Sequence, residues 1–403
     1  MNKEIISSKN KNDDDAIKLE VKNEENEQNL EINPSNINEK LIDEMNKEIN
    51  KETPKAKKRF FGIDLIRVLS CFLVMQIHSG QLYYIDLEGG LVKTEKNIYP
   101  GIFNSMALVS VPLFVMISGY LLLPMKTNYS TFLKKRFTRI LFPYLAFNLF
   151  YNIYYYIRGN IDLKTMFLNI PKVFINFSVG HLWFLYMIMG IYLYIPIITP
   201  WIQIAEKKHF YYYFTIWGIS SFSCYLHLFY DGIWGEVFWN NCTIVSSFIG
   251  YSGYAVLGAF IKLHLKDKNL YILGIILYVI GTIINIGGYF YKREEATTTQ
   301  EIEITWRFDS FNVAIASFGV FLLLRKVECK NKIITKILND ISLKSFGMYL
   351  VHLFFIKLFG YIFDAPNQFP ISGIFVIALF SFISSYIVIK IVSFVPYSQY
   401  IIG

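Results

Sequence analysis

One apolar stretch, FGIDLIRVLSCFLVMQIHSG, carries a carboxylate, a guanidinium and an imidazole, at Asp64, Arg67 and His78. Arg67 and His78 are 11 positions apart, or three helical turns, so both side chains point the same way, ~16 Å apart along the axis. Asp64 lies one turn before Arg67 on the same face. Because ionisable groups inside an apolar helix are costly and commonly functional, we expect this face to line a protein interior or a wet cavity. The alternative is a buried Asp64–Arg67 ion pair, with His78 as a satisfied interfacial residue.

Two further histidines stand at polar positions in apolar stretches. In SFGMYLVHLFF, the residues Ser345, Tyr349 and His352 are spaced i, i+4, i+7 and share one helical face. That face fits a functional site and a polar seam between two helices equally well. His181 opens the stretch GHLWFL, and Trp183 behind it suits an interfacial belt as well as the wall of a site.

A basic run, Lys134, Lys135, Arg136 and Arg139, precedes another apolar stretch. Anchoring at the membrane surface explains Lys134 best. The guanidinium groups of Arg136 and Arg139, one turn apart, also suit phosphate binding.

Several common motifs are absent from the sequence. None of the four cysteines lies in a CxxC pair, so we expect no metal ion and no redox motif, and two free thiols are favoured over a Cys224–Cys242 disulfide. The lack of a P-loop, an HExxH and a GxSxG string argues against a nucleotide-driven pump, a zincin and a serine hydrolase. Aromatic residues lie inside apolar runs and not among basic patches, so no nucleic-acid partner is expected.

The composition divides the chain into two parts. Charged residues make up 17% of the chain, against about 25% in soluble proteins. Residues 1–58 hold 11 Lys and 14 Asp or Glu with few aromatics, which predicts a disordered cytoplasmic tail. Residues 59–403 predict an all-α integral membrane domain in which ten transmembrane helices cross the lipid bilayer. The expected spans are about 61–82, 103–123, 140–157, 181–199, 210–230, 243–263, 270–291, 308–324, 345–363 and 370–394.

The loops between these spans predict the orientation. Those at 125–139 and 325–344 are rich in Lys and Arg, whereas those at 231–242 and 364–369 have none and 292–307 is rich in Glu. Basic loops remain in the cytoplasm, so both termini are expected there.

Five strings in order resemble the membrane acyltransferase-3 family, over about residues 60–395. They are IDLIRVLSCFLVMQIHS, with Arg67 and His78 separated by ten residues, VPLFVMISGYLL, FLKKRFTRILFPY, HLWFL and YLVH. The resemblance implies a bacterial multi-pass O-acyltransferase of the cytoplasmic (inner) membrane that modifies a surface glycan or a lipid-linked saccharide. Some relatives carry an extracytoplasmic domain that receives the acyl group. None is expected here, which leaves direct transfer and handover to a separate protein both open.

With this resemblance, the candidate residues take roles. Acetyl-CoA, or another acyl-CoA such as succinyl-CoA, is the expected donor substrate, with no bound cofactor. Lys135, Arg136 and Arg139 would hold its phosphates. His78 would act as general base or as a covalent acyl relay, Arg67 would stabilise the oxyanion or position the donor, and Asp64 would fix Arg67. The residues expected to line the acceptor side or the cavity are His181, Trp183, Ser345, Tyr349 and His352.

Two other functions fit the same pattern. A transporter of sugars or polysaccharide precursors would also place charges inside a helical bundle, although the paired broken helices typical of that class are not evident. A non-catalytic partner of a glycan synthase would tolerate substitution of Arg67 and His78.

Overall fold

The computed structural model describes residues 59–403 except 87–88, 174–178, 223–224, 226–247, 249, 267 and 368, together with the backbone of three short segments near the N-terminus. The chain divides into two compact units, Met1–Arg59 and Phe60–Gly403. Cys224 and Cys242 lie outside the described residues.

The first unit contains three strands. Strands β1 (Ile5–Ser8), β2 (Ile17–Val21) and β3 (Leu30–Ile32) form an antiparallel sheet in the order β1-β2-β3. Ile17 pairs with Ile32, and Leu19 with Leu30. The sequence IKLEV in β2 alternates with the two-residue period of a strand.

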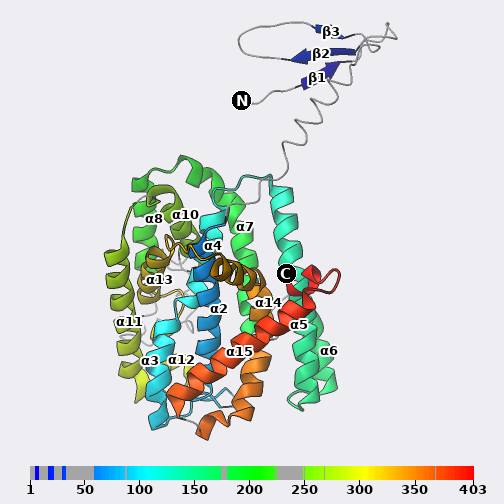
Figure 1. The fold of residues 1–403 in the computed structure, drawn as a ribbon. Coiled ribbons are helices and arrows are strands. Elements are labelled where there is room, and N and C mark those ends of the chain that lie inside the picture. The colour runs from blue at the N-terminus through cyan, green and yellow to red at the C-terminus, as the bar shows by residue number, and fades with distance from the viewer. Residues whose placement is uncertain are drawn as a thin grey trace. The chain divides into compact units, whose positions relative to one another are not determined.

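The second unit is built from helices, arranged side by side (Figure 1). The longer helices are α2 (Phe61–Gln81), α3 (Ile98–Ala107), α4 (Ser110–Leu122), α5 (Tyr129–Ile157), α6 (Leu163–Lys172), α7 (Trp183–Ile204), α8 (Lys207–Ser220), α10 (Ser252–His264), α11 (Tyr271–Arg293), α13 (Phe311–Leu324), α14 (Lys332–Ile362) and α15 (Pro370–Val392). Short helical turns connect them at η2 (Glu95–Asn97), η3 (Gly180–Leu182), α12 (Thr299–Ile302), η7 (Ile304–Trp306), η8 (Ala365–Asn367) and α16 (Gln399–Ile402).

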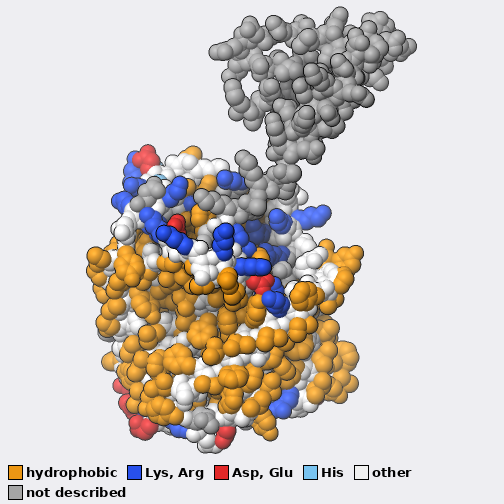
Figure 2. All heavy atoms as spheres, viewed as in Figure 1, with side chains coloured by type: hydrophobic (Ala, Val, Ile, Leu, Met, Phe, Trp, Pro, Cys, Tyr) orange, Lys and Arg blue, Asp and Glu red, His pale blue; other side chains and the backbone are white. Residues whose placement is uncertain are grey.

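This unit is a membrane protein. On the face drawn in Figure 2, apolar side chains form a broad band, and Lys and Arg gather beyond one edge of it. Within the described residues, seven helical segments are long and apolar enough to cross a bilayer. They correspond to every expected span except 140–157, 210–230 and 243–263, so the count of ten is not confirmed. Span 140–157 lies in α5, and the other two overlap residues that are not described.

Helices α2 and α14 begin on one side of this unit, where α15 finishes, and we call that side the basic end. We call the opposite side the acidic end. At the basic end, the Lys262 ammonium donates to the Leu123 carbonyl and the Arg325 guanidinium to the Lys268 carbonyl. The two long basic loops predicted here are largely helical, because α5 begins at Tyr129 and α14 at Lys332. Lys and Arg are good helix formers, so a transmembrane helix extends through them into the interface.

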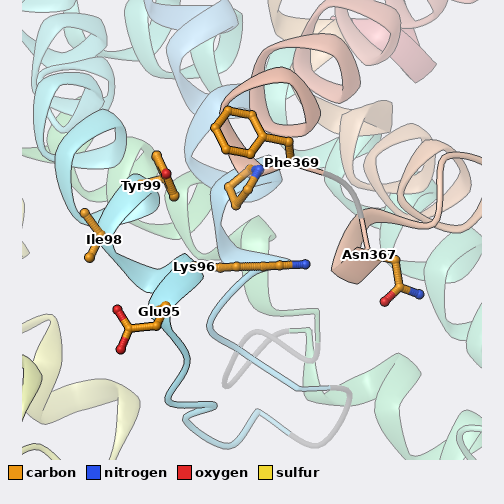
Figure 3. Close-up of a pocket in the computed structure, with 7 residues that line it drawn as sticks. Glu95, Lys96, Ile98, Tyr99, Asn367 and Phe369 are labelled. Carbon is orange, nitrogen blue, oxygen red and sulfur yellow. The ribbon is translucent and has the colours of Figure 1, made fainter.

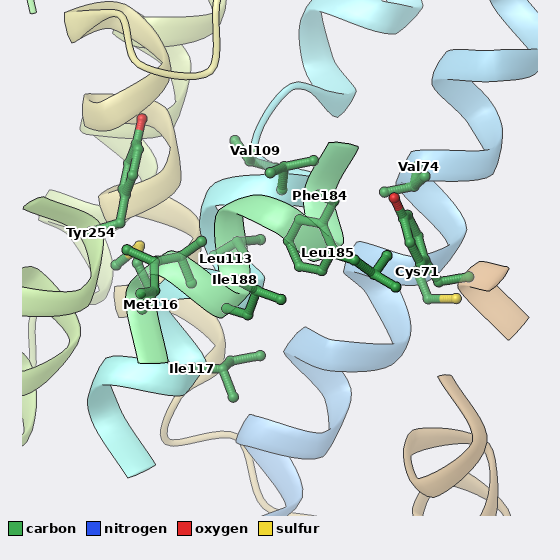
Figure 4. Close-up of a cluster of buried hydrophobic side chains, with 14 of the residues drawn as sticks. Cys71, Val74, Val109, Leu113, Met116, Ile117, Phe184, Leu185, Ile188 and Tyr254 are labelled. Atoms are coloured by element: carbon green, nitrogen blue, oxygen red, sulfur yellow. The ribbon is translucent and has the colours of Figure 1, made fainter. Parts of the chain in front are cut away.

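The buried core joins α2, α4, α7 and α10 (Figure 4). Gly119 of α4 and Gly258 of α10 let two backbones meet there. A Cβ on Gly119 would lie 1.9 Å from the Ala255 carbonyl oxygen, and one on Gly258 would lie 2.1 Å from that of Met116. Small residues permit this close approach in membrane proteins, where apolar burial drives association weakly.

We predict that Gly119→Ala lowers the stability of the unit by about 1–3 kcal/mol, because the added methyl group meets backbone. Thermal unfolding of the purified protein in detergent measures the change. Gly287→Ala in α11 is the matched control, since nothing lies within 4 Å of a Cβ there. Equal unfolding temperatures for Gly119→Ala and the natural protein would contradict this packing.

A small apolar cluster at the acidic end covers the end of α2. Tyr84 is fully buried there against Trp306, with ring centroids 6.2 Å apart, and its hydroxyl donates to Glu303 Oε1 at 2.5 Å. Burial raises the pKa of the Glu303 carboxyl above its usual 4.5, and the hydrogen bond from Tyr84 opposes that rise. The Tyr84–Glu303 hydrogen bond connects the segment after α2 to the segment before α13.

The raised pKa of Glu303 predicts a pH dependence of stability. The folded state keeps the carboxyl proton at pH values where the unfolded chain has lost it, so stability falls as the pH rises above about 4.5. Glu303→Gln should remove this part of the pH dependence. Unfolding temperatures of both proteins between pH 4 and pH 8 measure it, and parallel curves would contradict the assignment.

Candidate active site

Helices α2 and α14 run in the same direction and meet along a polar seam. On α2 the contacting residues Asp64, Cys71 and His78 recur every seven positions, and Arg67 lies in the same stripe. A seven-residue spacing keeps one side of a helix turned toward its neighbour. The seam therefore explains why the ionisable groups of α2 share one face: they pack against α14.

The first contact of the seam, near the basic end, joins two charges to a hydroxyl. The Arg67 guanidinium lies 3.2 Å from Asp64 Oδ1 and donates to Ser342 Oγ at 2.9 Å, while Ser342 Oγ donates to Asp64 Oδ1 at 2.5 Å. The Asp64 side chain is 4% exposed and that of Arg67 is 24% exposed. The predicted Asp64–Arg67 pair is thus present, and the guanidinium keeps an accessible edge.

The last contact of the seam, toward the acidic end, is a cluster of three histidines. The rings of His78 and His352 lie 5.2 Å apart between centroids, and those of His181 and His352 lie 5.3 Å apart. His352 is 0% exposed and His181 is 5% exposed. Three helical segments, α2, η3 and α14, supply one imidazole each, so residues from distant parts of the chain form a single group.

Hydrogen bonds fix the tautomers of this cluster. His78 Nδ1 donates to Gln81 Oε1 at 2.7 Å, His352 Nδ1 donates to the Tyr349 carbonyl, and His181 Nε2 makes a long 3.5 Å contact to the Leu350 carbonyl. Because these oxygens only accept, each bond puts the proton on the nitrogen that makes it. The other nitrogen of each neutral ring carries a lone pair. His181 Nδ1 and His352 Nε2 are buried and have no hydrogen-bond partner among the described residues. The cluster can therefore accept protons from a ligand's hydroxyl groups.

Two tyrosines hold the cluster in place. The Tyr349 hydroxyl donates to the His181 carbonyl. The Tyr151 hydroxyl donates to the Leu350 carbonyl at 3.0 Å and accepts from the Phe354 amide at 3.3 Å, and its ring lies 4.7 Å from that of His181. These bonds link α5 and η3 to α14 around the histidines.

Two predicted cavity residues do not join the cluster. The Ser345 hydroxyl donates to the Ser342 carbonyl of its own helix, and its carbonyl accepts from Cys71 Sγ at 3.7 Å in the middle of the seam. Among the described residues, the ring contacts of Trp183 are with Phe184, Tyr251 and Phe308, and the last is stacked at 5.9 Å. Ser345 packs two helices, and Trp183 belongs to a separate aromatic group.

The predicted donor-binding residues occupy the basic first half of α5. Lys135 and Arg139 are exposed. The Arg136 guanidinium lies 5.7 Å from the ring centres of both Phe132 and Tyr192, and its Nε is buried without a hydrogen-bond partner among the described residues. Cation–π contacts orient this guanidinium and leave its charge available.

Two pockets stand out, and the three histidines line neither. One, of about 480 Å³, opens at the acidic end between Lys96, Tyr99 and Phe369 (Figure 3). The other, of about 700 Å³, lies at the basic end against α14 and α15. Within the described residues, no group of three or more His, Cys, Asp or Glu side chains is placed to hold a metal ion.

The sequence analysis missed Gln81, Ser342 and Tyr151. Gln81 lies at i+3 from His78, and Ser342 lies at i−3 from Ser345, so extending each predicted face by one turn would have included both. Tyr151 lies in NLFYNIYYYI, where nothing local distinguishes it from its neighbours.

A model of the acyltransferase domain matches residues 60–390, which includes the seam and all three histidines. The chain belongs to the membrane acyltransferase-3 family. As a member of that family it is an acyltransferase, and the transporter and non-catalytic alternatives lose their support. No curated protein and no solved structure matches the chain.

We predict that Ser342→Ala destabilises this acyltransferase more than Ser345→Ala does. Loss of the Ser342 hydroxyl removes hydrogen bonds to two charged groups, with a cost of about 1.5–3 kcal/mol, whereas Ser345 makes one neutral bond worth about 0.5–1.5 kcal/mol. Both serines are buried and one turn apart, so they are matched controls. Equal unfolding temperatures for the two variants would contradict the described geometry.

Proposed function

We propose that the protein moves an acetyl or other short acyl group from acyl-CoA to a hydroxyl group of a cell-surface glycan, with His78 as general base or acyl relay. The observation that carries the proposal is the histidine cluster, in which His181 Nδ1 and His352 Nε2 are buried without a hydrogen-bond partner among the described residues. The family supplies the acyl-transfer chemistry.

His78 is the best placed of the three histidines. It is half-buried, whereas His181 and His352 are buried, so a ligand reaches it first. Gln81 holds its Nδ1 proton, which leaves Nε2 to take a proton from the acceptor hydroxyl or to attack the thioester carbonyl itself. His352 and Tyr349 form the wall behind it.

Arg67 acts best as a donor-positioning group. It lies ~16 Å along α2 from His78, too far for its guanidinium to contact an acyl carbonyl at the imidazole. The donor would instead extend along the seam, with its phosphates near Lys135, Arg136 and Arg139 and its acyl group near His78. Asp64 and Ser342 hold the Arg67 guanidinium in position for this contact.

The proposal also implies an orientation in the membrane. With the basic end in the cytoplasm, as expected for the bacterial inner membrane, the donor enters from the compartment that contains coenzyme A. The histidines then lie toward the opposite face, where the glycan or lipid-linked saccharide is present. Both termini would be cytoplasmic.

The test is labelled-acetyl transfer from acetyl-CoA by membranes that contain the full chain. His78→Gln should lower the rate by about 10²- to 10⁴-fold, because it removes general-base or relay chemistry while keeping the size of the side chain. The matched control is His209→Gln at the exposed start of α8, which should leave the rate unchanged.

Equal protein levels in the membrane must be shown for all variants. A His78→Gln protein that transfers acetyl at a near-natural rate would contradict the proposal. If the natural protein transfers acetyl slowly and another acyl group faster, the assignment of the donor changes and the role of His78 does not.

A further inference from the structure

The pocket at the basic end has no part in the proposed function. It lies between the first turns of α14 and the last turns of α15, and its volume is about 700 Å³. Its lining residues include one carboxylate, Asp340, and four lysines, Lys330, Lys332, Lys336 and Lys390.

The single carboxylate is already engaged. Asp340 Oδ1 accepts from Lys344 at 2.5 Å, and Oδ2 accepts from the Tyr386 hydroxyl at 2.5 Å and from Lys390 at 3.3 Å. Lys330, Lys332 and Lys336 are exposed and make no ion pair with a described residue. The pocket therefore presents an excess of positive charge.

The pocket also faces away from the seam. Asp340 and Ser342 are two positions apart on α14, about 200° around the helix axis, and Ser342 contacts α2. The pocket and the Arg67 group thus lie on opposite sides of the same helix, so a ligand in one does not touch the other.

Its depth matches the headgroup layer of the membrane. Helix α14 has 31 residues, a length of ~46 Å, against a hydrocarbon core of ~30 Å. The helix is therefore ~16 Å longer than the core, and the lysines at its start place that end in the headgroup layer. Apolar side chains remain exposed there, with Ile337 at 54% and Leu343 at 55%, and Ile387 of α15 at 49%. Exposed lysines and exposed apolar side chains therefore lie close together and form an amphiphilic surface.

We propose that this pocket binds the phosphate headgroup of an anionic phospholipid, whose acyl chains lie along the exposed apolar faces of α14 and α15. A soluble phosphate would use the lysines alone, whereas a lipid uses both parts of the surface. Basic pockets between transmembrane helices on the cytoplasmic side suit such headgroups. The inference rests on the membrane location of the unit and on the proposed cytoplasmic position of the basic end, and it is independent of the acyl-transfer mechanism.

The experiment measures binding of a fluorescent phosphatidylglycerol to the purified full chain in uncharged detergent. Lys332→Gln/Lys336→Gln should weaken binding roughly 10- to 30-fold, since each lysine near a lipid phosphate contributes about 1 kcal/mol. Lys330→Gln, in the loop before α14, provides a second variant that should weaken binding about 5-fold without altering a helix. The control Lys207→Gln/Lys208→Gln removes the same charge from the exposed start of α8 and should change binding less than 2-fold.

Competitors separate the possible sources of phosphate. Unlabelled phosphatidylglycerol should displace the probe, and phosphatidylcholine, coenzyme A and inorganic phosphate at the same concentration should not. Displacement by coenzyme A or inorganic phosphate would make this a general phosphate site and overturn the lipid assignment. Equal binding of phosphatidylcholine, or equal weakening by the α8 control, would also overturn it.

Discussion

The contact between α2 and α14 is the constraint on which the site depends. Along the seam, polar groups interrupt the apolar stretches of two helices, and each must meet a partner because lipid offers none. Asp64 and Arg67 meet Ser342, Cys71 meets the Ser345 carbonyl, and His78 meets His352. Both helices rise by the same amount per residue, so the charged contact and the histidine contact lie ~15–16 Å apart along each helix. The seam thus sets the register of the site.

The remaining helices surround the seam and complete it. Close glycine contacts between α4 and α10 build the core beside α2, and Tyr151 of α5 fixes the backbone of α14 near His352. At the acidic end, the Tyr84–Glu303 hydrogen bond connects the chain just after Gln81 to the segment before α13. Several elements therefore support the imidazoles. Their hydrogen bonds keep each ring in one tautomer, with a lone pair on the other nitrogen for a ligand.

Helical periodicity predicted part of this structure. It predicted the shared face of Arg67 and His78 and the face of Tyr349 and His352, because these depend only on local spacing. The length of the apolar stretches predicted seven of the ten spans. The meeting of His78, His181 and His352 depends on how three segments pack, which periodicity does not specify. The basic starts of α5 and α14 were predicted as loops because charge was read as the end of a helix, although Lys and Arg continue one.

The central claim of the proposal is that His78 carries the acyl-transfer chemistry and that His352 acts through its contact with the His78 ring. A double-mutant cycle of His78→Gln, His352→Gln and the combined variant, with labelled-acetyl transfer as the readout, tests it most directly. Residues that act together are strongly non-additive, so the combined variant should be no slower than the slower single variant. If the fold losses in rate of the two single variants multiply in the combined variant, the two residues act independently and the account is contradicted.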